Sequence, residues 1–561
     1  MMIKLDTRNW QALSERYEAL LESPLTAKEV PTWLREWSDL EAQIKEDASQ
    51  AASRSHENTA DQVAEERYLH YVREILPKME VAHDQLVQRL FKVEDYTPPA
   101  DQQLMMQDFH VTRRLFRAEN VPLQTEISVL RNQFRKVTGG MTIEWAGETR
   151  TFNQAALLYT KAERDQRELA WRTVHERWLE DRTTLNQLYL DMLALRRQIG
   201  RNAEFENYRA YAWLDRGRYD YQPEDAFVFH DAIEQEVVPV AQRIYERRRA
   251  ALGLERLRPW DLDVETSNQP PLQPFQDVAE LEEGCSRIFH AIDPLLGEQF
   301  DVLRDGYLDL ASRPNKAQGG YCSARHVSKR SYIFMNAVGQ HRNVQTLLHE
   351  GGHAFHNQHA THLPLIWMRH APMEMCEVAS MGMELLASPY FEKEKGGFYS
   401  QADANRARIE HLEELVLFFP YMAVVDAFQH WVYSDAPEDL SAEALDQKWG
   451  ELWDRFMVGV EWSGLETQKR TGWHRKRHIF LYPFYYIEYG LAQVGALQVW
   501  RNALNDQADA LAAYRHALSL GGTRSLSQLY HSADIRFAFD APTLRQLMAL
   551  VEEKLDELRA N

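Results

Sequence analysis

Two histidines four residues apart, with a glutamate directly after the first, restrict the fold of this chain more than any other feature. The stretch from Thr346 to His356 reads TLLHEGGHAFH and contains His349, Glu350 and His353. On an α-helix, residues i and i+4 differ by about 40° in azimuth, so both imidazoles face one point. Two neutral ring nitrogens at that spacing can share one zinc ion. The motif therefore predicts a helix with a metal site on one face.

Glu350 and the two glycines after it argue against a purely structural helix. Glu350 lies one residue further round the helix, where it can reach a water at the metal without being a ligand. Two glycines inside a helix cost about 2 kcal/mol relative to alanine, and an ordinary helix does not require them. Gly351 and Gly352 are expected where another backbone, such as a strand or a substrate, approaches closely. A helix with two structural histidines is the alternative that the pentapeptide alone leaves open.

A hydrolytic zinc site needs a third protein ligand and an open fourth position, and two residues compete for the third. His359 completes the spacing HExxHxxHxxH, but that signature needs a glycine three residues after the second histidine, where this chain has histidine. On a continuous helix, His359 would point about 80° away from His349. Glu377 lies in MEMCEVASMGME, where apolar neighbours make an unpaired carboxylate costly to bury. We favour Glu377, and Glu374 and Glu384 are either supporting carboxylates or solvated residues.

A third stretch, HIFLYPFYYIEY, begins at His478 and is rich in tyrosine. Tyr482, Tyr486 and Tyr489 stand at helical spacing and would line one side of a helix. Such a stripe is more often packing than catalysis. Phenolic donors are, however, what a zinc peptidase needs to stabilise an oxyanion, so both interpretations stay open on the residues alone.

Helix formers with apolar residues at helical spacing dominate the rest of the chain. Residues 160–200 form one long run of this kind, and so does the opening segment through Leu90, with a polar loop expected at 49–61. An alternating pattern at 141–152 predicts a β-hairpin. The proline-rich stretch 265–274 is typical of a linker.

The sequence SYIFMN at 331–336 predicts a short strand ahead of the zinc helix. We expect this strand to have an exposed edge, so that an extended peptide could add to it as a further strand. Phe334 and Asn336 are then the expected substrate contacts.

Charge and cysteine content exclude several classes of partner and scaffold. The chain has 561 residues, enough for more than one domain, with 64 basic and 84 acidic residues and a net charge of −20. That charge disfavours nucleic acid and anionic membranes as partners. Three cysteines are too few for a disulfide framework. The apolar stretch 415–425 is too short to span a bilayer, no secretory leader is visible, and we expect a cytoplasmic protein.

Three motifs, HEGGHAFH, EVASMGMELL and HIFLYPFYYIEYGLAQVGALQ, occur in this order and together resemble the M3 peptidases. This is the thimet oligopeptidase and oligoendopeptidase F group, and the resemblance is strongest to the Pz-peptidase-like oligoendopeptidases. It covers residue 122 to the C-terminus. It implies a mainly α fold in which two helical lobes flank a deep substrate channel, with a small β-sheet near the zinc helix. We place an N-terminal helical lobe at 1–200 and a catalytic zinc-peptidase lobe at 201–561.

The resemblance also implies an activity, which is zinc-dependent cleavage of internal bonds in short unstructured oligopeptides. One Zn²⁺ per chain is expected, and the oligomeric state is not indicated. A zinc-containing protein that binds peptides without cutting them, and a zinc exopeptidase, are the rival functions. Residue by residue, the implied roles are metal ligands for His349, His353 and Glu377, general base for Glu350, donors to the substrate carbonyl and oxyanion for His478, Tyr486 and Tyr489, and a substrate contact for Tyr482.

Overall fold

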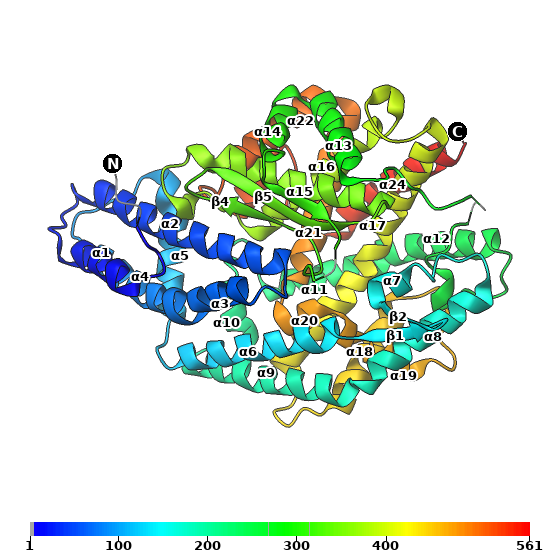
Figure 1. The fold of residues 1–561 in the computed structure, drawn as a ribbon, viewed down its shortest axis with the longest axis horizontal. Coiled ribbons are helices and arrows are strands. Elements are labelled where there is room, and N and C mark those ends of the chain that lie inside the picture. Colours follow the sequence, from blue (N-terminus) through cyan, green and yellow to red (C-terminus); the bar gives the residue numbers. More distant parts are fainter. Residues whose placement is uncertain (1–4, 267–268, 314, 561) are drawn as a thin grey trace. The chain divides into compact units, whose positions relative to one another are not determined.

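The computed structural model describes residues 5–266, 269–313 and 315–560 and is mainly helical, with two small β-sheets (Figure 1). The chain divides into two compact units, each built from three separate stretches of sequence. Unit 1 comprises Met1–Phe116, Leu272–Ala407 and Ala492–Phe537, and unit 2 comprises Arg117–Pro271, Arg408–Leu491 and Ala538–Asn561.

These units differ from the expected division at residue 200, because helices far apart in the sequence pack into the same unit. The predicted linker 265–274 does contain one of the boundaries, between Pro271 and Leu272. Ser267 and Asn268 of that linker lie outside the described residues.

Unit 1 consists of helices around a three-stranded sheet. Helix α17 begins in this unit and α21 ends in it. The helices and strands of unit 1 are α1 (Trp10–Glu22), α2 (Val30–Glu57), α3 (Gln62–His70), α4 (Leu76–Leu90), α5 (Gln103–Leu115), α13 (Val278–Ile292), α14 (Pro294–Leu303), β3 (Leu308–Ala311), β4 (Tyr321–Arg325), β5 (Arg330–Ala337), α15 (His341–His359), α16 (Met373–Ala387), α17 (Gln401–His430), α21 (Tyr486–Asn505), α22 (Gln507–Ser519) and α23 (Leu526–Ser532).

The predicted strand at 331–336 is confirmed as β5, but its expected exposed edge is wrong. The strand order is β3-β5-β4, with β3 parallel and β4 antiparallel to β5. Both edges of β5 are therefore hydrogen-bonded, and four consecutive side chains from Tyr332 to Met335 are buried. Because both faces of β5 are covered, its sequence does not alternate between apolar and polar residues. The sequence therefore does not indicate which strands flank β5. An edge of this sheet belongs to β4 instead.

Helix α2 extends to Glu57 and includes most of the polar stretch that we expected to be a loop. Ser49 and Ser53 of this stretch accept hydrogen bonds from the Arg325 guanidinium at 2.6 and 2.9 Å. The Ser49 hydroxyl also bonds that of Ser323 at 2.6 Å. These polar residues belong to the face of α2 that packs against strand β4. They are polar within a helix because β4 supplies hydrogen-bond partners for them.

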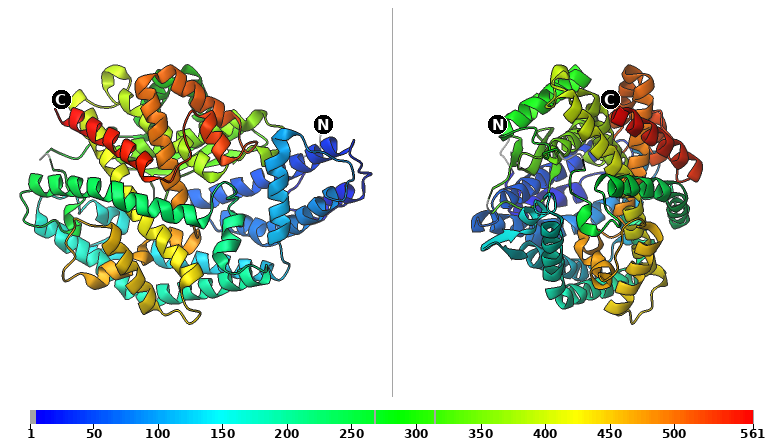
Figure 2. Two further views of the ribbon diagram at one scale, coloured as in Figure 1. Left: turned by 180° about the vertical axis from the view of Figure 1, so that it is seen from behind. Right: turned by 90° about the vertical axis from the view of Figure 1, so that its right-hand side faces the viewer.

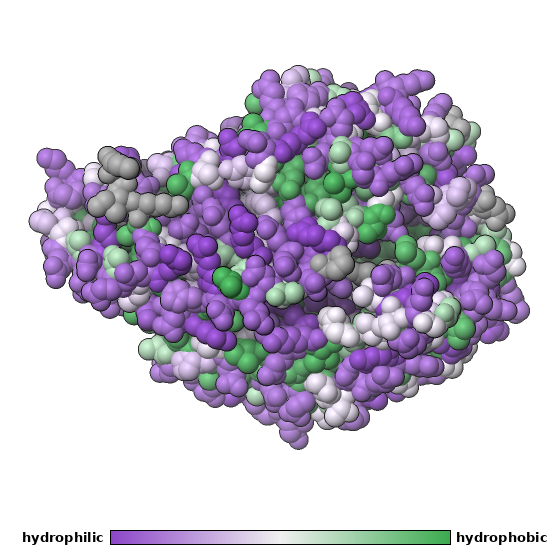
Figure 3. Space-filling view, viewed as in Figure 1, coloured by the Kyte–Doolittle hydropathy of each residue, from purple (hydrophilic) through white to green (hydrophobic). Residues whose placement is uncertain are grey.

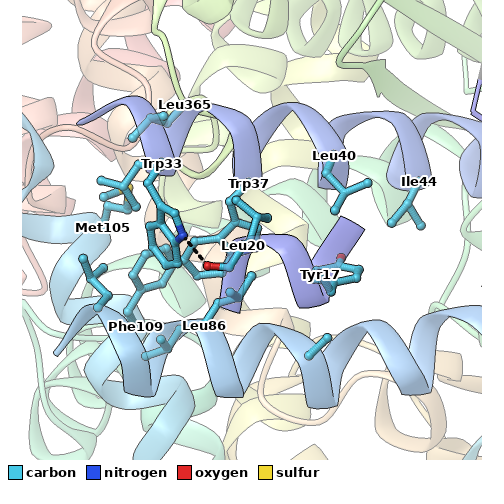
Figure 4. Close-up of a cluster of buried hydrophobic side chains, with 14 of the residues drawn as sticks. Tyr17, Leu20, Trp33, Trp37, Leu40, Ile44, Leu86, Met105, Phe109 and Leu365 are labelled. Atoms are coloured by element: carbon cyan, nitrogen blue, oxygen red, sulfur yellow. Dashed lines mark hydrogen bonds between the residues drawn. The ribbon is translucent and has the colours of Figure 1, made fainter. Parts of the chain in front are cut away.

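The N-terminal helices of unit 1 enclose an aromatic core that also contains a buried charge. Trp33 donates to the Leu20 carbonyl at 2.9 Å within this core (Figure 4). The Trp37 indole and the His83 imidazole both bond Glu41, each at 2.7 Å. Burial raises the pKa of Glu41, but the charges of Lys45 and His83 outweigh that effect and lower the pKa to about 2. Glu41 is therefore ionised in the folded protein.

In its described residues, unit 2 is helical apart from one hairpin. Its further elements are α6 (Asn120–Gly139), β1 (Thr142–Trp145), β2 (Glu148–Thr151), α7 (Phe152–Ala156), α8 (Arg164–Glu180), α9 (Arg182–Asn202), α10 (Tyr208–Asp215), α11 (Pro223–Ala232), the π-helical segment η3 (Ile233–Val237), α12 (Val238–Ala251), α18 (Ala442–Phe456), α19 (Glu466–Arg470), α20 (Arg477–Leu481) and α24 (Ala541–Ala560).

Two predictions for unit 2 are tested by these bounds. The hairpin is confirmed, and positive φ angles at Ala146 and Gly147 suit a two-residue turn. The long run at 160–200 is confirmed as helical from Arg164 onward, and it forms two helices because the backbone at Asp181 leaves the helical region. The C-terminal α24 lies alongside α12 (Figure 2), where Arg243 pairs with Glu552 at 2.7 Å.

The apolar stretch 415–425 lies within α17 and is largely buried, as predicted. The helical stretch Gln401–Asp435 is long and apolar enough to cross a membrane, but 72% of its apolar window is buried inside the protein. That burial is typical of a core helix. Hydrophilic side chains cover most of the face shown in Figure 3, with hydrophobic residues in scattered groups.

Candidate metal centre and tyrosine cluster

Helices α15 and α16 bring together in unit 1 three side chains of types that bind metal ions. The Nε2 atoms of His349 and His353 lie 3.4 and 3.5 Å from Oε2 of Glu377. One ligand atom from each of these residues lies within 4.8 Å of the other two, and they form the one such group found in the described residues. The i, i+4 histidines and the glutamate on the next helix therefore converge as the sequence predicted.

The spacing of the three side chains fits a zinc ion. Two ligands bonded to zinc at about 2.1 Å with tetrahedral geometry lie about 3.4 Å apart. The two distances to Glu377 match that value. Burial favours the neutral acid at Glu377, but His353 and His349 hold the pKa of this carboxyl well below its usual range. The carboxylate is thus in the ionised form that a metal ligand requires.

Hydrogen bonds from α16 orient this ligand set. Glu384 Oε1 lies 2.7 Å from Nδ1 of His349, so the ring presents its other nitrogen to Glu377. The Ser380 hydroxyl donates to Oε2 of Glu377 at 2.9 Å. Glu384 is therefore a supporting carboxylate, one of the two possibilities left open by the sequence. Metal-binding histidines commonly have such a partner.

Glu350 lies beside the ligand group and is not part of it. Its side chain is buried, and burial raises the pKa of its carboxyl despite the nearby histidines. Gly320, directly before β4, lies beside Glu350, since a Cβ on Gly320 would be in ordinary contact with Oε1 of Glu350 at 3.4 Å. A raised carboxyl pKa suits a group that accepts a proton and later returns it.

The two glycines of HEGGH allow other parts of unit 1 to approach α15. A Cβ on Gly352 would lie 2.4 Å from the Ala379 carbonyl oxygen and 2.7 Å from Cα of Ser380. A Cβ on Gly351 would lie 2.6 Å from the Phe289 ring. The expected close backbone is therefore present at Gly352, and it is a helix, α16, rather than a strand or a substrate. This contact brings Glu377 within reach of the two histidines.

The rival third ligand, His359, is the last residue of α15, which continues unbroken through His356. His359 is absent from the ligand group found in the described residues. Burial lowers the pKa of His359 and lowers that of His356 to about 3, so both rings are neutral.

The tyrosine-rich stretch forms a cluster of rings in unit 2. Around the His478 ring, the ring centroids of Tyr486 and Tyr489 lie at 5.1 and 5.8 Å. Tyr485, to which the sequence assigned no role, stacks on His478 at 5.9 Å and contacts Tyr489 at 5.0 Å. We call His478, Tyr485, Tyr486 and Tyr489 the tyrosine cluster.

The expected helical stripe of Tyr482, Tyr486 and Tyr489 is wrong for Tyr482, which lies outside both helices. Helix α20 ends at Leu481 and α21 begins at Tyr486, and Pro483 lies in the turn between them. Tyr482 keeps a contact with His478 at 6.2 Å and is 43% exposed.

Phe334 and Asn336 support the sheet beside α15. Phe334 is buried and stacks on Tyr321 of β4 at 5.0 Å. The Asn336 amide donates to the carbonyls of Ala317 and Gly319 at 2.9 and 3.0 Å. Both side chains therefore shape β4 and the glycine turn before it.

A sequence model described as Peptidase family M3 matches residues 157–549. The chain belongs to peptidase family M3. The oligoendopeptidase F homolog of Borreliella burgdorferi is 24% identical over 318 residues, which are 54% of this chain and 50% of that protein. Oligopeptidase PepF of Bacillus subtilis is 24% identical over 335 residues, 57% of this chain and 47% of that protein. The chain thus matches about half the length of these curated M3 relatives.

Solved structures extend the M3 fold to the whole chain. A structure of Pz peptidase A with inhibitor 2 superposes with a TM-score of 0.91 at 24% identity, covering 99% of each chain. Oligoendopeptidase-F from Enterococcus faecium gives a TM-score of 0.68 at 15% identity, covering 98% of this chain and 97% of that one. The helical segments before residue 157, outside the sequence match, are therefore part of the same fold.

Two polar residues of the M3 site were missed or left open by the sequence. Ser380 follows Glu377 by three residues, one helical turn, and that spacing was the available signal. Glu384 follows it by seven residues, two turns along the same face of α16.

Proposed function

We propose that the chain is a zinc metallopeptidase that cleaves internal peptide bonds of short, unstructured oligopeptides. The convergence of His349, His353 and Glu377 beside the buried Glu350 carries this proposal. Membership of family M3 supports it independently. A purely structural metal site would not need a glutamate held next to the ligands without binding the metal.

His349, His353 and Glu377 would hold one zinc ion. When bound, zinc polarises the scissile carbonyl and acidifies the attacking water. Glu350 takes the proton of that water and passes it to the leaving amine. Burial raises the pKa of its carboxyl, which suits a group that accepts the proton of that water.

We assign the remaining chemical roles to the tyrosine cluster. Tyr486 and Tyr489 donate hydrogen bonds to the oxyanion, and His478 binds the substrate carbonyl. The family resemblance supports these assignments, and so does the grouping of both phenol rings around His478. Tyr482 contributes to substrate binding from its partly exposed position.

Strand β4 binds the substrate backbone in place of β5. In the described sheet β4 is hydrogen-bonded to β5 alone, so its second edge can accept an extended peptide. Gly320, the residue before β4, lies beside Glu350. A peptide paired with β4 would therefore pass close to the base. Phe334 and Asn336 act indirectly by fixing β4. Backbone pairing tolerates varied side chains, in keeping with a broad range of peptides.

The test is Glu350→Gln, which removes the base but no ligand. We expect normal zinc content and loss of hydrolysis of a quenched-fluorescent peptide. Glu394→Gln, on an exposed turn of unit 1, is the matched control and should match the wild type. Hydrolysis within a few-fold of wild type would exclude Glu350 as the base. Mass spectrometry of the products distinguishes internal cleavage from trimming of chain ends. If the wild-type protein leaves all peptides intact, the rival function, peptide binding without cleavage, is favoured.

A further inference from the structure

The turn between α20 and α21 has an unusual backbone at a buried aromatic residue. Phe484 has φ +63°, in the left-handed region, and its side chain is fully buried. A bulky residue holds this conformation only where its surroundings over-determine it. The turn connects the helix of His478 to the helix of Tyr486 and Tyr489. Its geometry therefore sets how these three side chains lie relative to one another.

Polar side chains from elsewhere in unit 2 bind the backbone of this turn. The Gln429 side chain accepts a hydrogen bond from the Phe484 amide at 2.8 Å. The Arg218 guanidinium donates to the Phe484 carbonyl, and Nε of Arg216 donates to the Pro483 carbonyl at 2.7 Å. Gln429 and Arg218 are both buried. The amide and the carbonyl of Phe484 are thus both hydrogen-bonded by buried side chains.

Glu488 connects the two arginines to α21. Its Oε1 accepts from Arg218 at 2.8 Å and lies 3.4 Å from Nη1 of Arg216. Glu488 is 1% exposed and stands between Tyr486 and Tyr489 in the sequence. The same ion pairs therefore hold the turn and the first turn of α21. We call Arg216, Arg218 and Glu488 the turn clamp.

We propose that the turn clamp is a positioning device that fixes Tyr486 and Tyr489 relative to His478. The proposal rests on the donor roles given to these residues in the proposed function. Nη2 of Arg218 donates to both the Phe484 carbonyl and the Glu488 carboxylate. Arg216 uses two nitrogens of its planar fork, Nε for the Pro483 carbonyl and Nη1 for Glu488. A lysine keeps the charge, but its nitrogen lies one bond nearer the backbone than Nη2 of arginine, so it holds the turn less firmly. The clamp acts through the tyrosines and has no contact with substrate.

The test is a double-mutant cycle on the zinc-loaded full-length enzyme with a quenched-fluorescent peptide. Arg218→Lys should lower kcat about tenfold with KM within about twofold, because small displacements of donors act mainly in the transition state. In the Tyr486→Phe/Tyr489→Phe background, Arg218→Lys should lower kcat by less than about twofold, since the hydroxyls that it positions are gone. Zinc content should stay at the wild-type value throughout.

Arg243→Lys is the matched control, because Arg243 pairs with Glu552 on the surface of the same unit and should leave kcat unchanged. Equal kcat losses from Arg218→Lys in both backgrounds would refute the positioning role of the turn clamp but not the roles of the tyrosines. An unchanged kcat for Arg218→Lys in the wild-type background would refute it in the same way. If Arg218→Lys does not fold, the less buried Arg216→Lys enters the same cycle with the same criteria. A wild-type kcat in the double phenylalanine variant would instead remove the tyrosine roles, and the clamp with them.

Discussion

Gly352→Ala is the substitution that most directly probes how the metal ligands are brought together. The new Cβ would lie 2.4 Å from the Ala379 carbonyl oxygen and 2.7 Å from Cα of Ser380. Both are backbone atoms of α16, so no side-chain rotation relieves the contact. Ordinary contacts are about 3.5 Å, and α15 and α16 must therefore separate by about 1 Å.

The separation has consequences for zinc and for stability. Moving Glu377 by about 1 Å would lengthen its 3.4 and 3.5 Å distances to the histidine nitrogens to about 4.4 Å. Two zinc–ligand bonds span at most about 4.2 Å, so one zinc could no longer bind all three residues at normal distances. We expect zinc affinity to fall about a hundredfold or more. Overpacking should cost about 3 kcal/mol and alanine should return about 1 kcal/mol of helix propensity, leaving a net loss of about 2 kcal/mol.

Zinc affinity is measured by competition with a chelator, and the free energy of unfolding of the metal-free protein by urea denaturation. Gly139→Ala is the control, because Gly139 is also helical but a Cβ there meets no atom within 4 Å. This control should leave zinc binding unchanged and alter the free energy of unfolding by at most about 1 kcal/mol in the stabilising direction. Wild-type zinc affinity in Gly352→Ala would refute the view that close helix contact builds the site.

Three further outcomes are expected. Glu384→Gln should weaken zinc binding about tenfold to a hundredfold in a chelator competition assay, because the His349 ring loses its charged partner. Tyr486→Phe and Tyr489→Phe should each lower kcat about a hundredfold with little change in KM. A wild-type kcat in both variants would show that these tyrosines serve only in packing. Glu41→Gln should lower the free energy of unfolding on the order of 3 kcal/mol at neutral pH. The pKa of Glu41 falls from 4.5 to about 2 on folding, so this contribution is present above pH 4.5 and is lost toward pH 2, where urea titrations of wild type and variant should converge.

The sequence was sufficient where local chemistry determines structure. HEGGH predicted a helix, the shared direction of His349 and His353, and a close backbone neighbour, because side-chain direction and glycine geometry are local properties. The apolar surroundings of Glu377 indicated a partnered carboxylate, since burial without a partner is costly. The hairpin followed from an alternating pattern around Ala146 and Gly147.

Features that depend on distant neighbours could not be inferred. The central position of β5 depends on β3 and β4, whose sequences do not reveal their pairing. The polar stretch at 49–57 is helical because β4 supplies partners for its serines. Phe484 gave no sign of a left-handed turn, because the residues that stabilise it lie at least 55 positions away in the sequence.

Zinc content of Glu377→Ala and His359→Ala tests the central claim most directly. Equilibrium dialysis of both variants against buffered zinc, followed by elemental analysis, provides the measurement. We predict one zinc per chain for the wild type and for His359→Ala, and severe loss of zinc with no hydrolysis for Glu377→Ala. Loss of zinc from His359→Ala, with zinc retained by Glu377→Ala, would contradict the ligand set formed by α15 and α16.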